Sequence, residues 1–323
     1  MVSFSIPRKV IIDCDPGIDD AVALCMALFE PRLEVMAVTP VAGNVPAGQA
    51  TLNVQAVIDQ LDPPRLPRVG SARPLEGVGE IKAHLLHGKD GLGGTGVEVS
   101  QLHQQHAAEK ILCDQVRSAP GEITIICLGP LTNIARAFHR DPELPALIGQ
   151  IILSSGSING RGNATPAAEF NIHSDPYAAK TVLQAVVPKL MIPLEVSEEV
   201  KFDMGFIQQL PSATTRAGRL LRRIIQFSFR AYHQHMGRER IQIPAAVALL
   251  AAIQPELFEI QSMTGDIETE GELTVGATVF DYRPLSNWGY PLDVAHQIDS
   301  AAAKDCIIRC LSAAGEEESL PGD

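Results

Sequence analysis

The first half of the chain alternates short, almost wholly apolar runs with segments whose apolar residues recur at helical spacing. The runs Val10–Cys14, Ile123–Leu128 and Gln150–Ser154 are apolar at nearly every position, which favours strands buried on both faces of a sheet. Helical spacing follows in Asp19–Phe29 and Ala47–Leu61. This alternation predicts an α/β fold with a mostly parallel central sheet and helices on both faces.

The rest of the chain extends this pattern and then changes it. Further strands are predicted at Leu33–Val41 and Lys189–Ile192, and further helices at Thr132–Phe138 and Asp175–Leu183. After Pro193 we expect helices in Phe206–Met236 and Pro244–Ile253, strands at Met263–Thr269, Glu272–Tyr282 and Asp293–Gln297, and a last helix at Ser300–Leu311. Because no linker rich in Ser, Gly or Pro separates these parts, we predict a single domain over residues 1–312 with an appended helical and β-hairpin region. The acidic residues 313–323 are predicted to form a disordered tail.

The composition argues against several classes of protein. The chain has 38 acidic and 26 basic residues and a formal net charge of −12. This disfavours nucleic-acid and membrane-surface partners, since both need clustered Lys and Arg. No apolar run approaches the roughly 20 residues that span a bilayer. The six cysteines show no C-x-x-C spacing, so we expect buried free thiols and a cytoplasmic protein.

Four acidic side chains gather where the first predicted strand ends. In D-C-D-P-G-I-D-D, Asp13 and Asp15 end the strand, and Asp19 and Asp20 open the next helix. Functional residues of open α/β sheets collect at the carboxyl ends of strands. Carboxylates this close repel one another unless a cation or strong hydrogen bonds compensate, and hard oxygen ligands favour Ca²⁺ or Mg²⁺. Helix capping and the helix dipole are an alternative explanation, but only for the two residues that open the helix.

Amide and carboxylate groups recur in three later motifs. V-A-G-N carries Asn44, H-G-K-D-G-L-G-G begins at His87, and G-N-A-T-P-A-A-E-F-N carries Asn163, Glu169 and Asn171. Each motif lies after a predicted strand or in a Gly-rich loop, where sites are usually built. The last group is suited to clamp a polyol, although each residue alone is equally typical of a turn or a helix cap.

The motifs D-C-D-P-G-I-D-D-A-V-A-L and G-N-A-T-P-A-A-E-F-N-I-H-S-D-P, supported by L-G-P-L-T-N-I-A, resemble the inosine–uridine-preferring nucleoside hydrolase family. The resemblance covers nearly the whole chain, from Lys9 to about Leu311. It implies a single-domain fold, a homodimer or homotetramer, and a small-molecule ribonucleoside as substrate. The implied reaction is Ca²⁺-assisted hydrolysis of the N-glycosidic bond of purine or pyrimidine ribonucleosides to ribose and free base, as in nucleoside salvage.

Carried over by position, the resemblance assigns the calcium and catalytic groups. Asp15 is expected to be the general base toward a Ca²⁺-bound water and also a calcium ligand. Asp20 is expected to be a second carboxylate ligand, and Leu128 is expected to contribute its backbone carbonyl. Asp13 is expected to hold these ligands in place without binding the metal itself. A carboxylate base suits a calcium ion, because calcium lowers the pKa of water less than zinc does.

The resemblance also assigns the ribose pocket. Asp19 and Asn171 are expected to hold ribose hydroxyls, and Asn163 and Glu169 are expected to hold the 5′ side. Asn44 is expected to line the same pocket. Nearby carboxylates suit this chemistry, because cleavage passes through an oxocarbenium-like transition state with positive charge at C1′.

The resemblance breaks at two positions that concern chemistry. Family members usually carry a His-Asp pair just before the Pro that opens a buried helix. The His protonates the leaving base in many of them, and the Asp is a further calcium ligand. Here Gln242 and Ile243 precede Pro244. A Gln side chain cannot donate a proton at neutral pH, and an Ile side chain cannot bind a hard cation.

Three interpretations of this break stay open. In the first, the enzyme works with weaker calcium binding and a substitute acid, for which His87, His233 and His235 are candidates. In the second, the substrate has a leaving group that needs no acid. In the third, the protein binds a nucleoside or ribose without turnover. The base pocket is expected to include His87, Tyr232 and His235.

Overall fold

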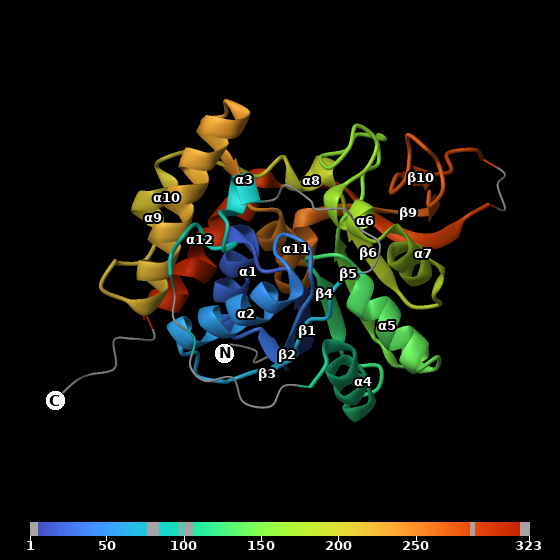
Figure 1. The fold of residues 1–323 in the computed structure, drawn as a ribbon, viewed down its shortest axis with the longest axis horizontal. Coiled ribbons are helices and arrows are strands. Elements are labelled where there is room, and N and C mark those ends of the chain that lie inside the picture. The colour runs from blue at the N-terminus through green and yellow to red at the C-terminus, as the bar shows by residue number, and fades with distance from the viewer. Residues whose placement is uncertain (1–5, 76–83, 97–98, 100–105, 285–287, 317–323) are drawn as a thin grey trace.

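The computed structural model describes residues 6–75, 84–96, 99, 106–284 and 288–316. Within these residues, nine strands form one sheet in the order β10-β9-β11-β6-β5-β4-β1-β2-β3. Neighbouring strands from β11 to β3 are parallel, whereas β9 pairs antiparallel with both β11 and β10. The fold is therefore the predicted single α/β domain with a mostly parallel sheet (Figure 1).

The strands are short and the longest belong to the appended region. They are β1 (Arg8–Cys14), β2 (Leu33–Pro40), β3 (Arg68–Val69), β4 (Thr124–Cys127), β5 (Gln150–Ser154), β6 (Lys189–Ile192), β9 (Phe258–Ile267), β10 (Thr278–Phe280) and β11 (Tyr290–Ile298). The pair β7 (Lys201–Phe202) and β8 (Ile241–Gln242) forms a separate antiparallel ladder.

Helices connect the strands and cover the sheet. They are α1 (Ile18–Phe29), α2 (Ala47–Leu61), α3 (His84–His87), α4 (Ala108–Ser118), α5 (Thr132–Arg140), α6 (Phe170–Ser174), α7 (Pro176–Gln184), α8 (Leu194–Ser197), α9 (Phe206–Gln209), α10 (Arg216–Met236), α11 (Pro244–Ile253) and α12 (Ser300–Glu316). Two 3₁₀ turns lie at Leu144–Leu147 and Pro255–Leu257. Among the described helices, none is long and apolar enough to cross a membrane.

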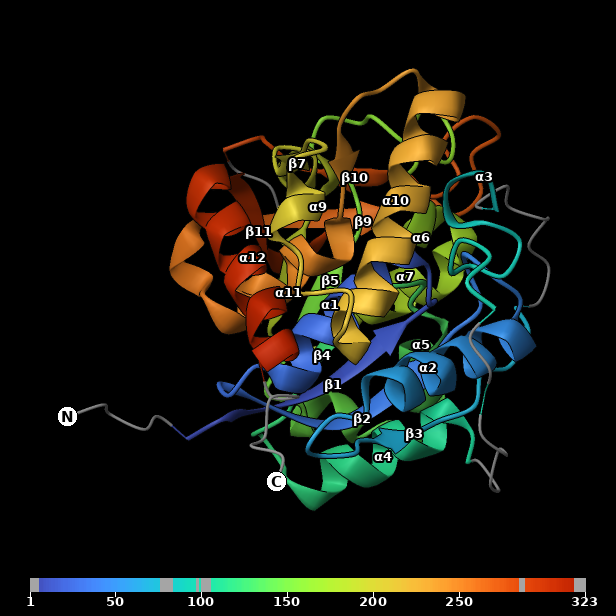
Figure 2. The ribbon, with the colours of Figure 1, turned by 90° about the vertical axis from the view of Figure 1, so that its left-hand side faces the viewer.

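The hydrophobic core has two parts, one on each face of the sheet. Val10 and Ile12 of β1 pack into the part formed with α1, α2, α10, α11 and α12, while Ile11 packs into the part formed with α4, α5 and α7. Figure 2 shows these helix layers on the two sides of the strands. Such two-sided burial explains why the parallel strands are apolar at successive positions.

The order of the strands reverses beside β1. From β1 the chain runs to β2 and β3 on one side, whereas β4, β5 and β6 extend to the other side. The carboxyl ends of β1 and β4 therefore border the crevice where open α/β sheets bind ligands. Leu128, directly after β4, is tied to this point because its N–H donates to the carbonyl oxygen of Asp13 at 2.7 Å.

Several predicted elements are confirmed with their bounds, and others differ. The strands Gln150–Ser154 and Lys189–Ile192 and the helix Pro244–Ile253 lie where the sequence predicts them. The strand predicted over Glu272–Tyr282 is reduced to β10, because its first half forms a turn. The predicted tail begins inside α12, which continues to Glu316.

The helix α12 extends beyond the predicted end of the domain. Ala314 keeps the last turn of α12 helical because it is buried in the core, so the predicted domain boundary at 312 lies inside a helix. The tail beyond 316 lies outside the described residues. All six cysteines are buried and free, as the sequence predicts.

Candidate active site

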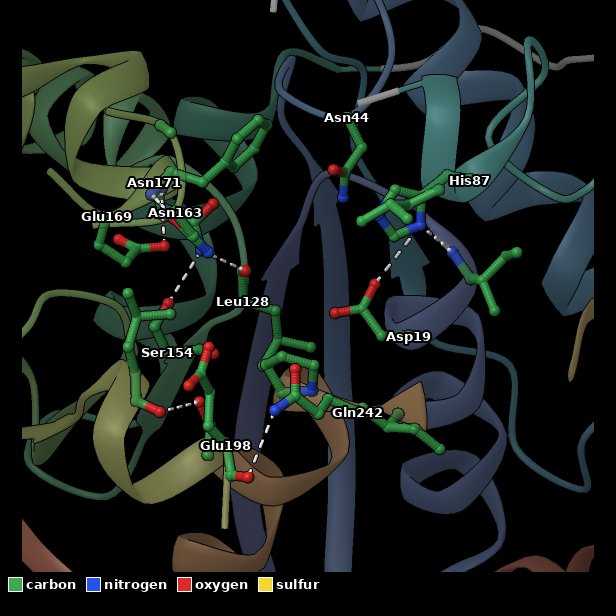
Figure 3. Close-up of a pocket in the computed structure, with 18 of the residues that line it drawn as sticks. Asp19, Asn44, His87, Leu128, Ser154, Asn163, Glu169, Asn171, Glu198 and Gln242 are labelled. Carbon is green, nitrogen blue, oxygen red and sulfur yellow. Dashed lines mark hydrogen bonds and ion pairs between the residues drawn. The ribbon is translucent and has the colours of Figure 1, made fainter. Parts of the chain in front are cut away.

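A cavity of about 510 Å³ opens at the carboxyl ends of the parallel strands. Its wall near β1 is formed by Asp15, Asp19, Asn44, His87 and Leu128. Figure 3 shows Asn44 and His87 together on one side of this cavity, with Asp19 below them. These residues come from segments far apart in the sequence, so the reversal of strand order brings the predicted groups into one site.

The acidic turn between β1 and α1 is almost closed to solvent. Asp15 and Asp20 are each 1% exposed, and Asp20 lies behind the cavity wall. The Asp15 Oδ2 atom accepts a hydrogen bond of 2.7 Å from the Asn44 backbone N–H. The Asp20 Oδ2 atom accepts one of 3.0 Å from the Gly17 N–H. Asp20 Oδ1 and Asp19 Oδ1 are buried without a hydrogen-bond partner.

Burial and mutual repulsion act together on these carboxyl groups. Burial, followed by the charge of Asp20, raises the pKa of Asp15 well above its usual range. Burial, followed by the charge of Asp19, likewise raises the pKa of Asp20. Hydrogen bonds from backbone N–H groups oppose both shifts only in part. Positive charge beside these carboxyl groups would lower both pKa values.

Two glycines allow the backbone to approach Asp15 closely. A Cβ atom at Gly129 would lie 2.7 Å from Asp15 Oδ1, and one at Gly43 would overlap Asp15 Oδ2. Gly129 directly follows Leu128 in the L-G-P-L-T-N-I-A motif. The motif thus brings the Leu128 carbonyl beside the carboxylates without steric conflict.

Asp13 is buried inside the sheet, two residues before Asp15. Its Oδ1 atom accepts hydrogen bonds from Thr39 Oγ1 at 2.6 Å and Asn133 Nδ2 at 2.8 Å. Complete burial raises the pKa of Asp13 to about 7. The Asn133 side chain also donates to the Pro40 carbonyl at 2.9 Å, so it links β1 to the end of β2. Sequence reasoning missed Asn133, although it lies within the L-G-P-L-T-N-I-A motif.

The opposite wall carries the amides and the carboxylate of the G-N-A-T-P-A-A-E-F-N motif (Figure 3). Asn171 Nδ2 donates to the carbonyl oxygens of Leu128 and Ser154, each at 2.8 Å. Asn163 Oδ1 accepts a bond of 2.8 Å from the Phe170 N–H. These bonds fix both amides and leave Asn171 Oδ1 and Asn163 Nδ2 available to a ligand.

Glu169 caps helix α6 beside these amides. Its carboxylate accepts hydrogen bonds from the backbone N–H groups of Asn171, Ile172 and Gly156 at 2.9, 3.1 and 3.0 Å. Burial nevertheless raises the pKa of Glu169 to about 7, and the three N–H groups oppose this increase. Glu169 therefore caps α6 and also lines the cavity.

His87 is held in one tautomer by the acidic turn. Its Nδ1 atom accepts a hydrogen bond of 3.0 Å from the Ile18 N–H, so the neutral ring carries its proton on Nε2. Burial lowers the pKa of His87, while Asp19, 3.8 Å away, opposes this decrease. Asn53 ties the two segments together from α2, because its Nδ2 donates to the carbonyls of Pro16 and Asp90.

The remaining wall comes from α10 and the start of α11. Tyr232, Gln242 and Ile243 line the cavity. The Gln242 side chain makes two long hydrogen bonds, of 3.3 Å to the Glu198 carbonyl and of 3.4 Å from Arg238. The assignment of His235 to the base pocket is wrong, because His235 lies on the exposed face of α10 and outside the cavity lining.

The donor set of the acidic turn fits a single hard cation. Two buried carboxylates and the Leu128 carbonyl are oxygen groups of the kind that hard cations prefer, and Asp20 Oδ1 is buried without a hydrogen-bond partner. The described residues contain no cluster of three or more His, Cys, Asp or Glu side chains that would hold a metal ion. Ile243, which is 2% exposed, supplies only an alkyl group at the position where the resemblance expects a further acid.

Comparison with known proteins agrees with this architecture. The family model described as "Inosine-uridine preferring nucleoside hydrolase" matches residues 10–305. The chain belongs to this family. It is 36% identical to "Probable uridine nucleosidase 2" of Oryza sativa subsp. japonica over 305 residues, covering 90% of this chain and 89% of the relative.

A bacterial relative and a solved structure extend the comparison. The chain is 36% identical to "Pyrimidine-specific ribonucleoside hydrolase RihA" of Salmonella agona over 281 residues, which is 84% of this chain and 88% of that protein. The solved structure of "Purine-Preferring Ribonucleoside Hydrolase from Gardnerella vaginalis" superposes with a TM-score of 0.88 at 26% identity, covering 95% of this chain and 99% of that one. Nucleoside hydrolases named for either class of base therefore share this fold.

Glu169 predicts a specific dependence of stability on pH. Its pKa is about 7 in the folded protein against an ordinary value of 4.5. The folded state therefore binds more protons than the unfolded state between these values, so stability falls as pH rises. From pH 5 to pH 8 we expect Glu169 to account for a loss of about 2 kcal/mol in the free energy of unfolding.

Urea denaturation of the wild-type protein and Glu169→Gln at pH 5 and pH 8 measures this loss. The decrease should be about 2 kcal/mol smaller in the variant, because Gln does not titrate. Glu256→Gln, at an exposed position, is the matched control and should keep the wild-type slope. Equal slopes in all three proteins would contradict the assigned cause.

Proposed function

We propose that the protein is a ribonucleoside N-ribohydrolase that cleaves the bond between ribose C1′ and the base. The observation that carries this proposal is one cavity in which a buried and a half-buried carboxylate face fixed amides. Asp15 and Asp19 line one wall, and Asn163, Glu169 and Asn171 line the other. The first wall suits a developing cation at C1′, and the second suits the hydroxyl groups of a ribose. The named activities of the relatives support the same reaction.

In the proposed reaction Asp15 is the general base. Water attacks C1′, and Asp15 takes a proton from that water. The bond between C1′ and the base breaks, and its electron pair leaves with the base nitrogen. The carboxylates of Asp15 and Asp19 stabilise the positive charge that builds on the ribose. The raised pKa of Asp15 strengthens it as a base whenever it is ionised.

The hydroxyl groups of the ribose would be held from three sides. Asn171 offers a fixed acceptor oxygen, and Asn163 offers a fixed donor on the 5′ side together with Glu169. Asn44 lines the pocket, and its backbone N–H holds Asp15 in place. These contacts would orient C1′ toward Asp15, the general base, without a change in the conformation of the side chains that line the site.

We further propose that Ca²⁺ binds between Asp15, Asp20 and the Leu128 carbonyl. When bound, it would offset the repulsion between the carboxylates and lower the pKa of a coordinated water. Because Ile243 contributes no ligand, we expect weak binding that depends on added metal.

The cavity wall at Gln242 limits the choice of substrate, because it offers no acid to protonate the leaving base. Gln242 has a neutral amide that does not release a proton. Burial raises the pKa of Tyr232 above its usual range, and its hydroxyl donates to the Gln242 carbonyl at 3.5 Å. Neither group is an acid at neutral pH. Substrates whose base departs without protonation should therefore be cleaved best, and binding without turnover is the competing function.

Asp15→Asn tests the assignment of the base. The variant keeps the size of the side chain but cannot accept a proton, so kcat should fall at least about 100-fold. The melting temperature should not fall, because the change removes a buried charge. Turnover of uridine and inosine and a thermal melt measure both effects. Asp305→Asn, at an exposed position, is the isosteric control. Retained activity in Asp15→Asn would exclude this residue as the base.

Melting curves with added Ca²⁺ test the proposed cation. A ligand that binds only the folded state raises the melting temperature as its concentration rises. The wild-type protein should therefore be stabilised by millimolar Ca²⁺, and Asp20→Asn should lose most of this response. An identical response in both proteins, or none in the wild type, would count against the site.

A panel of leaving groups tests the interpretation of Gln242. We expect p-nitrophenyl riboside, whose leaving group needs little protonation, to be cleaved faster than inosine. Gln242→His should raise inosine turnover about 10-fold or more and change p-nitrophenyl riboside turnover little, because only inosine needs an acid. Gln261→His, on an exposed part of β9, is the control. If ribosides bind but none is cleaved, the protein is a binding protein and the hydrolase proposal fails.

A further inference from the structure

The loop from β5 to α6 carries Asn163, and part of it is exposed. Asn159, Gly160 and Arg161 are exposed, and Arg161 also lines the cavity. Loops of this kind are mobile unless side chains from other elements satisfy their backbone. What holds this loop decides where the Asn163 amide lies.

One carboxylate from a different element binds the start of the loop. Glu195 Oε1, from α8, accepts hydrogen bonds from Ser157 Oγ at 2.8 Å and from the Asn159 N–H at 2.9 Å. The Ile158 N–H donates to both carboxylate oxygens at 3.1 Å. A charged acceptor makes stronger hydrogen bonds than a neutral one. Glu195 thus orients three consecutive residues of the loop.

Ser157 connects the segment bound by Glu195 to Arg161, which lines the cavity. Its Oγ atom accepts a hydrogen bond of 3.0 Å from the Arg161 N–H, two residues before Asn163. Its backbone exchanges hydrogen bonds of 2.9 and 3.0 Å with Thr278 Oγ1 on β10. Helix α8 and the appended hairpin therefore hold the same turn from two directions.

The second half of the loop is held by its own backbone. The N–H of Asn163 donates to the Ala168 carbonyl at 3.2 Å, and the Gly162 N–H donates to the Pro166 carbonyl at 3.1 Å. Asn163 Oδ1 is already bonded to the Phe170 N–H. The Asn163 Nδ2 group is therefore placed by the loop as a whole, and Glu195 binds the first turn of that loop.

We propose that Glu195 is a positioning residue that holds the Asn163 loop against α8 and thereby makes the site selective for ribosides with a 5′-hydroxyl group. This rests on the proposed function, in which Asn163 lies on the 5′ side of the ribose. Glu195 is absent from the cavity lining among the described residues, so it acts on the substrate only through the loop. A residue of merely structural value would affect all ribosides alike.

The test compares uridine with 5′-deoxyuridine in three variants. Glu195→Ala removes the acceptor, Glu195→Gln keeps an oxygen without the charge, and Glu199→Ala changes an exposed residue just beyond the same helix. In the wild type, uridine should have the higher kcat/KM. In Glu195→Ala the ratio of the two kcat/KM values should fall about tenfold, through KM, because one hydrogen bond to the 5′-hydroxyl is lost. Glu195→Gln should recover most of the ratio, and Glu199→Ala should leave it unchanged.

Two outcomes would overturn the proposal. An equal loss for both substrates would show that Glu195 only stabilises the fold, and an unchanged ratio would show that the loop does not need it. If the wild type binds both compounds without cleaving them, the hydrolase proposal fails, and the same ratio measured on Kd still tests Glu195. A melting curve of each variant shows that the protein compared is folded.

Discussion

The repulsion between the carboxylates of Asp15 and Asp20 is the constraint on which the rest of the site depends. Two buried acids this close are stable together only with positive charge or strong hydrogen bonds beside them. The backbone N–H groups of Asn44 and Gly17 supply part of this compensation, and the glycines at 43 and 129 allow that approach. Asp20 Oδ1 remains without a partner. A bound cation would compensate this repulsion, and the same carboxylates suit a transition state with a cationic ribose.

The fold places this acidic turn where other segments can complete it. Because the strand order reverses beside β1, the end of β4 brings the Leu128 carbonyl to the carboxylates. Asn171 then binds that carbonyl and so joins the acidic wall to the amide wall. Hydrogen bonds to backbone atoms thus fix both walls before any ligand arrives. This preorganisation is what a hydrolase of neutral substrates needs, since it avoids reorganisation during the reaction.

The buried strand β1 and its acidic end were predictable from local sequence, whereas the contacts between distant segments were not. Successive apolar residues in β1 and the cluster from Asp13 to Asp20 predict a buried parallel strand with an acidic end, because both signals are continuous in the chain. Asn53 and Glu195 gave no such signal. They act on backbone atoms of segments that approach only in the folded protein, so their partners cannot be read from spacing. His235 is close in sequence to Tyr232, and both were assigned to the base pocket. A helix directs some neighbouring residues to the cavity and others to solvent, and His235 is one that faces solvent.

In the proposed site a cation completes the turn between β1 and α1. A crystal structure of the protein grown with Ca²⁺ and ribose, with anomalous scattering measured, tests it directly. We expect one calcium ion bound by Asp15, Asp20 and the Leu128 carbonyl, with ribose hydroxyls among its remaining ligands. Ordered ribose with only water between the two carboxylates would contradict the proposed cation site, and so would calcium bound elsewhere.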